Sequence, residues 1–271
     1  MGNETENAVV RDMAIASLNV KEVISGASPF VVLPPEHTVG DLEKTLLRPI
    51  RKRGTSKFND AASFIAYFLL HSAGGRIYGQ VDPPLFIGVL NDNTGADPGW
   101  GDHRAHYACP LSREWKVWKG FSGTPRDQMV FAEFIETNTP DIVSTQPSEP
   151  TGAQMLEVAT SFKAQKKVNF ASGQRLDNGQ VEFTYVEDIQ GSAGAKGRIN
   201  IPESFYVAIP VFEGGAPYKI EAKLRYRLKE GVLTMWFDLV RDHKILEAAF
   251  MDVWKEISDG TEVTIWRGNP A

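Results

Sequence analysis

Hydrophobic and polar residues follow two different periodicities along this chain of 271 residues. Up to residue 137, short apolar runs alternate with amphipathic segments, a pattern that predicts helices mixed with strands. After a short helix expected over 153–164, apolar and polar residues alternate one by one, which is typical of half-buried strands. We therefore expect an α+β protein, with a mixed N-terminal half and a mostly antiparallel C-terminal β-sheet with a packed helix.

Cap residues, prolines and glycines delimit the elements expected in the first half. Asp60 is a suitable N-cap for a helix over 61–74, and Ser112 for a shorter helix that carries two tryptophans. Thr124 followed by Pro125 predicts another helix start, with the threonine as N-cap and the proline as the first helical residue. Strands are expected over 30–33 (FVVL) and 84–90 (PLFIGVL).

Turn residues between alternating segments predict paired strands in the second half. The sequence KKVNFASGQRLDNGQVEFTYVED (166–188) turns at Asp177-Asn178-Gly179 and predicts a hairpin. The segment 245–257 has a single apolar stripe, so it predicts the helix that packs on the C-terminal sheet. Further strands are expected over 205–212, 218–228, 232–240 and 261–266.

These elements suggest a division of the chain into four parts. We expect a disordered tail over 1–7, an α+β region over 8–137, a linker over 138–152 and a sheet with its helix over 153–271. The linker segment, NTPDIVSTQPSEPTG, holds three prolines and few apolar residues. The hydrophobic content of 42% suffices for one large core or two smaller ones, so the two halves can also form one compact domain.

Composition excludes several classes of protein. A formal net charge of −5 excludes a uniformly basic nucleic-acid binder, although a local basic surface is compatible with it. One cysteine cannot form an intrachain disulfide, and the N-terminus lacks the pattern of a secretory signal. The apolar run over 64–70 is too short to span a bilayer. We expect a soluble cytosolic protein without a membrane partner.

The segment DHRAHYAC (102–109) contains two of the five histidines and the only cysteine. In a strand, His103 and Cys109 share one face and His106 points to the other, whereas a zinc ion needs ligands that converge. We therefore expect neither a shared metal nor a cofactor, and we interpret Cys109 as a small buried hydrophobic residue.

Residues suited to catalysis are sparse. The chain has no G-x-S-x-G elbow and no P-loop, and the glycines of 191–197 lead into a strand-like segment instead of a helix. Glu133, Glu136 and Asp141 can form a carboxylate site, but acids opposite an apolar stripe are usually the solvated face of a helix, and we favour that interpretation. We assign no catalytic residue and expect a binding protein, not an enzyme.

Two basic clusters are the clearest candidates for a binding site. The first lies in 48–57 and consists of Arg48, Arg51, Lys52, Arg53 and Lys57. The second lies in the alternating segment 219–229, whose polar face carries one acid, Glu221, and the cations Lys219, Lys223, Arg225, Arg227 and Lys229. Such a stripe can follow a phosphate backbone, or it can pair with acids on a neighbouring strand. As candidate nucleic-acid contacts we take the first cluster and Lys223, Arg225, Arg227 and Lys229.

One strand suggests self-association. The segment SFYVAIPVF (204–212) is apolar on both faces, and Pro210 is typical of an edge strand. An open apolar edge needs cover, either from the helix at 245–257 or from a second subunit. We favour a homo-oligomer, with Phe205, Val207, Ile209 and Phe212 as its candidate interface.

Several segments together resemble a known family. DHRAHYACPLSREWKVW, FAEFIETNTPDI, KKVNFASGQRLDNGQVEFTY, KIEAKLRYRL and ILEAAFMDVW are similar, in order and spacing, to the YfdQ-like proteins of phages and prophages. The resemblance covers about residues 30–267 and implies a bacteriophage-derived protein that acts in the cytoplasm of its bacterial host. It implies no activity, so it transfers no catalytic residue.

Three hypotheses about function remain open at this point. The first is a self-assembling phage accessory protein that binds nucleic acid in phage DNA metabolism or counter-defence. The second is a metal-dependent hydrolase or nuclease that uses His103 and His106 with Glu133, Glu136 and Asp141. The third is a structural shell or scaffold protein.

Overall fold

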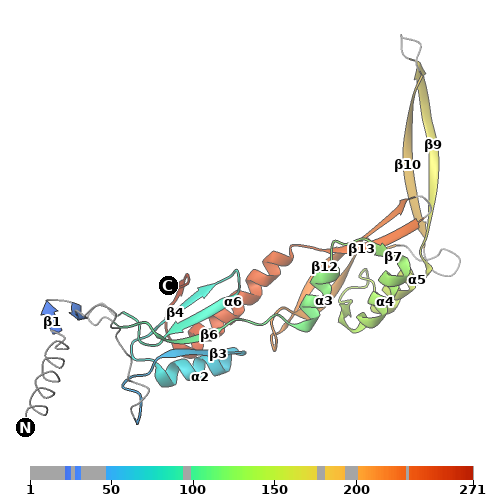
Figure 1. Ribbon diagram of the computed structural model, residues 1–271. Coiled ribbons are helices and arrows are strands. Elements are labelled where there is room, and N and C mark those ends of the chain that lie inside the picture. The colour runs from blue at the N-terminus through green and yellow to red at the C-terminus, as the bar shows by residue number, and fades with distance from the viewer. Residues whose placement is uncertain are drawn as a thin grey trace, which may run out of the picture. The chain divides into compact units, whose positions relative to one another are not determined.

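The computed structural model describes residues 22–25, 28–31, 47–93, 99–175, 181–192, 201–229 and 232–270 (Figure 1). By its contacts the chain divides into two units, residues 1–52 and Arg53–Ala271. In the first unit, β1 (Glu22–Ser25) and β2 (Ser28–Val31) form an antiparallel pair. β2 overlaps the predicted strand 30–33 by two residues; the tail predicted over 1–7 lies outside the described residues.

The second unit contains two five-stranded sheets. The first sheet has the order β14-β4-β5-β6-β3, with parallel pairs β14–β4 and β3–β6 and antiparallel pairs between them. Its strands are β3 (Gly54–Phe58), β4 (Arg76–Gln80), β5 (Leu85–Val89), β6 (His103–Tyr107) and β14 (Ile265–Arg267).

Two helices, α2 (Ala61–His71) and α6 (Asp242–Thr261), pack on one face of the first sheet. The Phe250 ring of α6 stacks on Phe86 with centroids 4.6 Å apart. Gly79 lets Trp254 approach β4, because a Cβ there would lie 2.6 Å from the indole ring. Gly88 does the same for α2, where a Cβ would lie 2.8 Å from Phe68.

The second sheet has the order β7-β13-β12-β11-β8 and is antiparallel throughout. Its strands are β7 (Arg126–Asp127), β8 (Ile142–Val143), β11 (Ser204–Pro210), β12 (Pro217–Lys229) and β13 (Val232–Leu239). The helices α3 (Arg113–Phe121), α4 (Gln128–Thr137) and α5 (Gly152–Ser161) supply its inner cover. Trp118 and Phe134, for example, both lie against Phe237 of β13.

The two halves of the sequence interleave. The α+β class is confirmed. The predicted helix 245–257 belongs to α6, whose large aromatic residues lie against the first sheet, and α6 also meets β12 of the second sheet, where the Tyr218 hydroxyl donates to Asp252. Residues 138–152, for which composition predicts a linker, contain the 3-10 helix η2 (Thr139–Asp141) and β8, which pairs with β11.

Local capping explains most helix boundaries. The side chains of Asp60 and Ser112 accept the predicted cap hydrogen bonds from the Ser63 and Trp115 amides. The predicted helix start at Thr124-Pro125 is wrong: α4 begins at Gln128, and the Asp127 carboxylate accepts from the Met129 amide. Arg126 and Asp127 instead pair with β13 as β7, so the helix begins three residues later than predicted.

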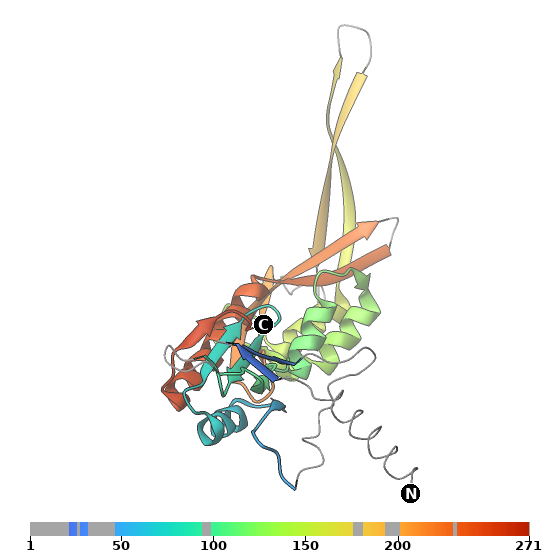
Figure 2. The same cartoon turned by 60° about the vertical axis from the view of Figure 1, so that its left-hand side comes forward.

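The two strands of the predicted hairpin are confirmed as the antiparallel pair β9 (Lys163–Arg175) and β10 (Val181–Ser192), which we call the ribbon. The turn predicted at 177–179 lies outside the described residues. The register of the ribbon runs from Val181 opposite Arg175 to Ser192 opposite Lys163, with a bulge between Thr184 and Tyr185. Figure 2 shows how strongly the two strands twist around each other. Within the described ranges, β9 and β10 pair only with each other.

Candidate nucleic-acid interface

The outer face of the second sheet carries the cationic stripe that the sequence predicts. On β12, Ile220, Ala222 and Leu224 are buried toward the helices. The side chains at the alternate positions point the other way, and all of them except the half-buried Glu221 are exposed. The exposed residues are Lys219, Lys223, Arg225, Arg227 and Lys229. The predicted alternation is therefore confirmed.

Part of this stripe is engaged within the chain. The Lys219 ammonium donates to Glu149 Oε1 at 2.6 Å and lies 4.3 Å from the centre of the Tyr206 ring. Arg225 Nε lies 3.1 Å from Asp238 Oδ2 on the neighbouring β13. The alternative in which cations pair with neighbouring acids thus holds for these two side chains, and Lys219 acts as a structural residue.

Glu149, the partner of Lys219, is a structural carboxylate that the sequence pattern does not reveal. Its side chain is only 7% exposed and also accepts hydrogen bonds from the amides of Thr145 (2.7 Å) and Gln146 (3.3 Å). The hydrogen bonds from Lys219 and from the Thr145 amide lower the pKa of Glu149 to about 2. The carboxylate connects the loop after β8 to β12 through its ion pair with Lys219. No local sequence pattern predicts this ion pair, because Lys219 lies far along the chain from Glu149.

The remaining cations of β12, which are Lys223, Arg225, Arg227 and Lys229, form a continuous row. We call these four residues, together with Trp236 and Tyr206, the cationic face. Trp236 lies directly opposite Arg225 in the register, and the Arg227 guanidinium lies 5.6 Å from the centre of its indole ring. Tyr206 of β11 lies on the same face, opposite Glu221.

The electrostatics of the cationic face favour anions. Alternate residues of a strand are about 6.7 Å apart, so the four cations follow one another at regular intervals along β12. The Arg225–Asp238 pair is half exposed on both sides, at 51% and 44%. Because an exposed ion pair contributes about 0–1 kcal/mol, Arg225 can exchange Asp238 for a phosphate at little cost.

The first basic cluster is divided between the two units. Arg48, Arg51 and Lys52 belong to the unit 1–52, whereas Arg53 and Lys57 belong to the second unit. Lys57 is exposed on β3, at the edge of the first sheet, so it lies in a different sheet from β12.

The histidines of DHRAHYAC lie on opposite faces of β6, as the alternation predicts. His103 is buried, and its Nε2 lies 3.1 Å from the Tyr67 hydroxyl of α2. His106 lies on the other face, where burial, Arg104 and Lys57 together lower its pKa. Cys109 follows the strand in a left-handed conformation (φ 40°), and burial raises the pKa of its thiol to about 12. Within the described ranges no three His, Cys, Asp or Glu side chains gather in a way that could hold a metal ion.

The carboxylates of the hydrolase hypothesis lie in another part of the fold. Glu133 and Glu136 are exposed on α4, which covers the second sheet, whereas both histidines lie in the first sheet. Asp141 accepts a hydrogen bond from the Trp118 indole at 2.7 Å and so anchors a core residue. The structure therefore does not bring the five proposed residues together.

The predicted subunit interface is buried within the chain, which is a correction. Phe205, Val207, Ile209 and Phe212 are all at most 3% exposed. Phe205 packs against Trp118 and Phe237, with ring centroids 6.2 and 5.7 Å apart, so α3 and the sheet itself cover this face. β8 pairs with residues 206–207 and takes the edge position that Pro210 suggested for β11.

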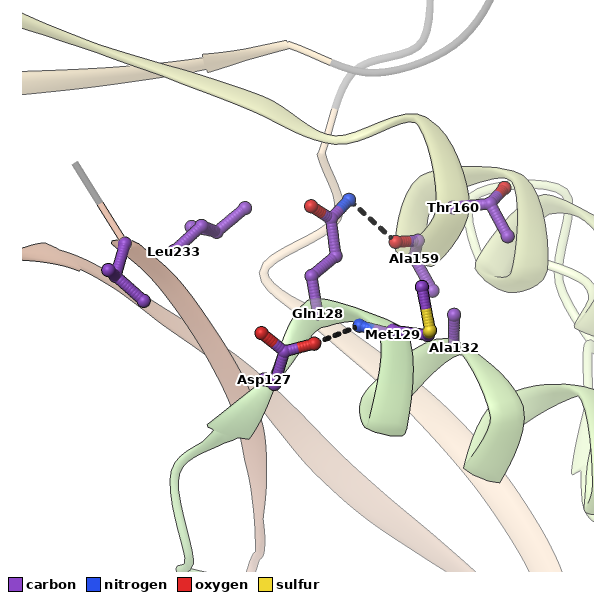
Figure 3. A pocket seen from close by; sticks show the side chains of 8 residues that line it. Asp127, Gln128, Met129, Ala132, Ala159, Thr160 and Leu233 are labelled. Atoms are coloured by element: carbon purple, nitrogen blue, oxygen red, sulfur yellow. Dashed lines mark hydrogen bonds between the residues drawn. The ribbon is translucent and has the colours of Figure 1, made fainter.

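A shallow groove of about 560 Å³ opens between the start of α4, the end of α5 and the start of β13 (Figure 3). The Gln128 amide donates to the Ala159 carbonyl at 2.9 Å, Asp127 caps α4 and the Thr160 hydroxyl donates to the Leu156 carbonyl, so these polar groups serve the fold. The other lining residues are Met129, Ala132, Ala159, Thr160, Val232 and Leu233. The groove is largely apolar, and the one carboxylate in its lining, Asp127, is engaged as the cap of α4.

Comparisons with known proteins place the chain in a family without defining an activity. No helix in the described ranges is both long enough and apolar enough to cross a membrane. No curated protein and no solved structure matches the chain. A family model matches residues 3–270, nearly the whole chain, and the chain therefore belongs to the family described as "Uncharacterized conserved protein (DUF2303)".

Proposed function

We propose that this chain is an accessory protein that binds nucleic acid on the cationic face of its second sheet. The observation that carries the proposal is the uninterrupted row of Lys223, Arg225, Arg227 and Lys229 on one side of β12. A row of cations on a rigid strand can contact successive phosphates, and the release of their counterions drives such binding. The acidic net charge of −5 makes this local concentration of positive charge stand out.

The aromatic residues of the same face favour a single strand over a duplex. Trp236 and Tyr206 are half-buried on the outer surface, next to cations of β12. Bases of a single strand are free to stack on such rings, whereas the bases of a duplex are already stacked on each other. The helices α3, α4 and α5 cover the inner face of the second sheet. Among the described residues, the outer face is therefore open to a single strand of nucleic acid.

The resemblance to YfdQ-like proteins supports a biological setting for this activity. A phage or prophage protein in the bacterial cytoplasm meets single-stranded DNA during phage DNA metabolism and during counter-defence. The proposal therefore includes such a role. No grouping of residues in the described ranges favours the hydrolase hypothesis, and a pure scaffold requires no cationic face.

The test is the affinity for a fluorescent single-stranded oligonucleotide, measured by anisotropy at several salt concentrations. Replacing Arg225→Glu together with Arg227→Glu should weaken binding and flatten the plot of log affinity against log salt. Each phosphate contact on a single strand contributes about 0.7 to that slope, so the slope should fall by about 1.4.

A matched control is Arg113→Glu with Lys116→Glu, which makes the same change of charge at two exposed positions of α3. This helix covers the inner face of the sheet, so the control should bind like the wild type. Absence of binding by the wild type at low salt, or equal effects of the two double variants, would refute the proposal.

A further inference from the structure

The groove between α4, α5 and β13 lies beside one end of the cationic face. Asp127, in the lining of the groove, is opposite Thr234 in the register, and Thr234 is opposite Arg227. Neighbouring strands lie about 4.8 Å apart, so about 10 Å separate the backbones of Asp127 and Arg227. A second lining residue, Val232, is directly opposite Lys229. A strand of nucleic acid that follows the row of cations therefore reaches the groove.

The groove is open to solvent and has the size of a site for a small ligand. Its volume of about 560 Å³ lies within the range of about 300–1,000 Å³ that such sites have. Met129 and Val232 in its lining are 69% and 57% exposed. Apolar side chains of this kind can cover the faces of a nucleobase that is not paired.

Two oxygens in the groove accept no hydrogen bond from any of the described residues. The amide group of Gln128 donates to the Ala159 carbonyl at 2.9 Å and to the Phe162 carbonyl at 3.2 Å, which fixes its orientation and leaves Oε1 as an acceptor. Asp127 uses Oδ1 to cap α4 and keeps Oδ2 as an acceptor. Figure 3 shows both of these oxygens on the side of the groove that faces Leu233. A ligand of the groove must therefore supply hydrogen-bond donors.

We infer that the groove holds a nucleobase of the strand bound on the cationic face, and that it selects bases with an exocyclic amino group. This inference rests on the proposed function. Cytosine presents an amino group, for which an aspartate is a usual partner, whereas thymine presents a carbonyl oxygen at the same position. That oxygen would face the Asp127 carboxylate with no proton between them. A phosphate is also excluded from the groove by the charge of Asp127, so the phosphates stay on Arg227 and Lys229.

The test compares the affinities of the protein for oligo(dC) and oligo(dT) of equal length. The two pyrimidines have the same size and differ in the donors and acceptors that they present. The wild type should bind oligo(dC) about 2- to 10-fold more tightly, which corresponds to the net contribution of one hydrogen bond. The slope of log affinity against log salt should be the same for both, because their phosphates make the same contacts.

Asp127→Asn replaces an acceptor of the groove with a donor. Asparagine is as good an N-cap as aspartate, so its oxygen should keep the cap of α4 and its amide group should take the place of Oδ2. The variant should lose the preference for oligo(dC) or prefer oligo(dT). The matched control is Glu133→Gln, which makes the same change of charge at an exposed position of α4 outside the groove and should keep the wild-type ratio. Melting curves check that both variants are folded.

The outcomes separate this inference from the proposed function. Equal affinities of the wild type for the two oligonucleotides, or a ratio that Asp127→Asn leaves unchanged, would overturn the inference. In either case the combined Arg225→Glu and Arg227→Glu change would still weaken binding if the cationic face is correctly assigned. Absence of binding to both oligonucleotides at low salt would overturn the inference and the proposed function together.

Discussion

At the scale of single residues, Glu149 shows how one carboxylate can join two distant segments. Its folded pKa of about 2 lies below the ordinary value of 4.5, so its ionised form is favoured by folding. The stabilisation is fully present above the ordinary pKa and is lost as the pH falls toward the folded value. We expect Glu149→Gln to lower the melting temperature at pH 7, since the amide cannot form the ion pair with Lys219.

The sign of this effect is checked by melting curves over a range of acidic pH. The difference between wild type and Glu149→Gln should shrink as the pH falls from about 4.5 to about 2, because the wild-type carboxyl becomes protonated. Glu133→Gln, an exposed change on α4, serves as the control and should leave the melting temperature nearly unchanged. A difference that stays constant down to pH 2 would show that the charge of Glu149 contributes nothing.

At the scale of elements, glycines within strands determine how closely the helices approach the first sheet. A Cβ at Gly79 would lie 2.6 Å from the Trp254 ring, which itself packs edge-to-face against both Phe86 and Phe250. We expect Gly79→Ala to destabilise the protein by about 1–3 kcal/mol, the usual cost of overpacking. Gly120→Ala on α3 has no atom within 4 Å of the new methyl group and should stabilise by up to about 1 kcal/mol. Urea unfolding measures both; equal effects would contradict the packing argument.

Elements whose signals are local were predictable from the sequence, and elements defined by distant partners were not. The caps at Asp60 and Ser112 and the alternation of β12 are confirmed because side-chain chemistry within a few residues produces them. The segment 138–152 has the composition of a linker, yet pairing with β11 makes β8 part of a sheet. Likewise, alternation predicted the cationic stripe, but only the register shows that Trp236 lies opposite Arg225.

At the scale of the whole second unit, neither five-stranded sheet is built from one half of the sequence. The C-terminal segment contributes the edge strand β14 to the first sheet. Residues before 144 contribute the strands β7 and β8 to the second sheet, and the helices α3 and α4 that cover it. The segment that leaves β6 of the first sheet is also bound to the end of β11, because the Ser112 amide donates to the Val211 carbonyl at 2.9 Å. We expect the sheets to unfold in one cooperative transition, because loss of either removes segments that the other needs.

Hydrogen exchange in the Gly79→Ala variant tests this expectation. The substitution lies in β4 of the first sheet, so a purely local effect would weaken the protection of amides in β4 and β5 only. Cooperative unfolding instead predicts that the amides of β12 and β13, in the second sheet, lose protection by the same free energy when exchange occurs through global unfolding. In the Gly120→Ala control, protection should rise in both sheets together. Protection of β12 that is unchanged in Gly79→Ala would show that the sheets unfold independently, and each would then be a separate domain despite the interleaved chain.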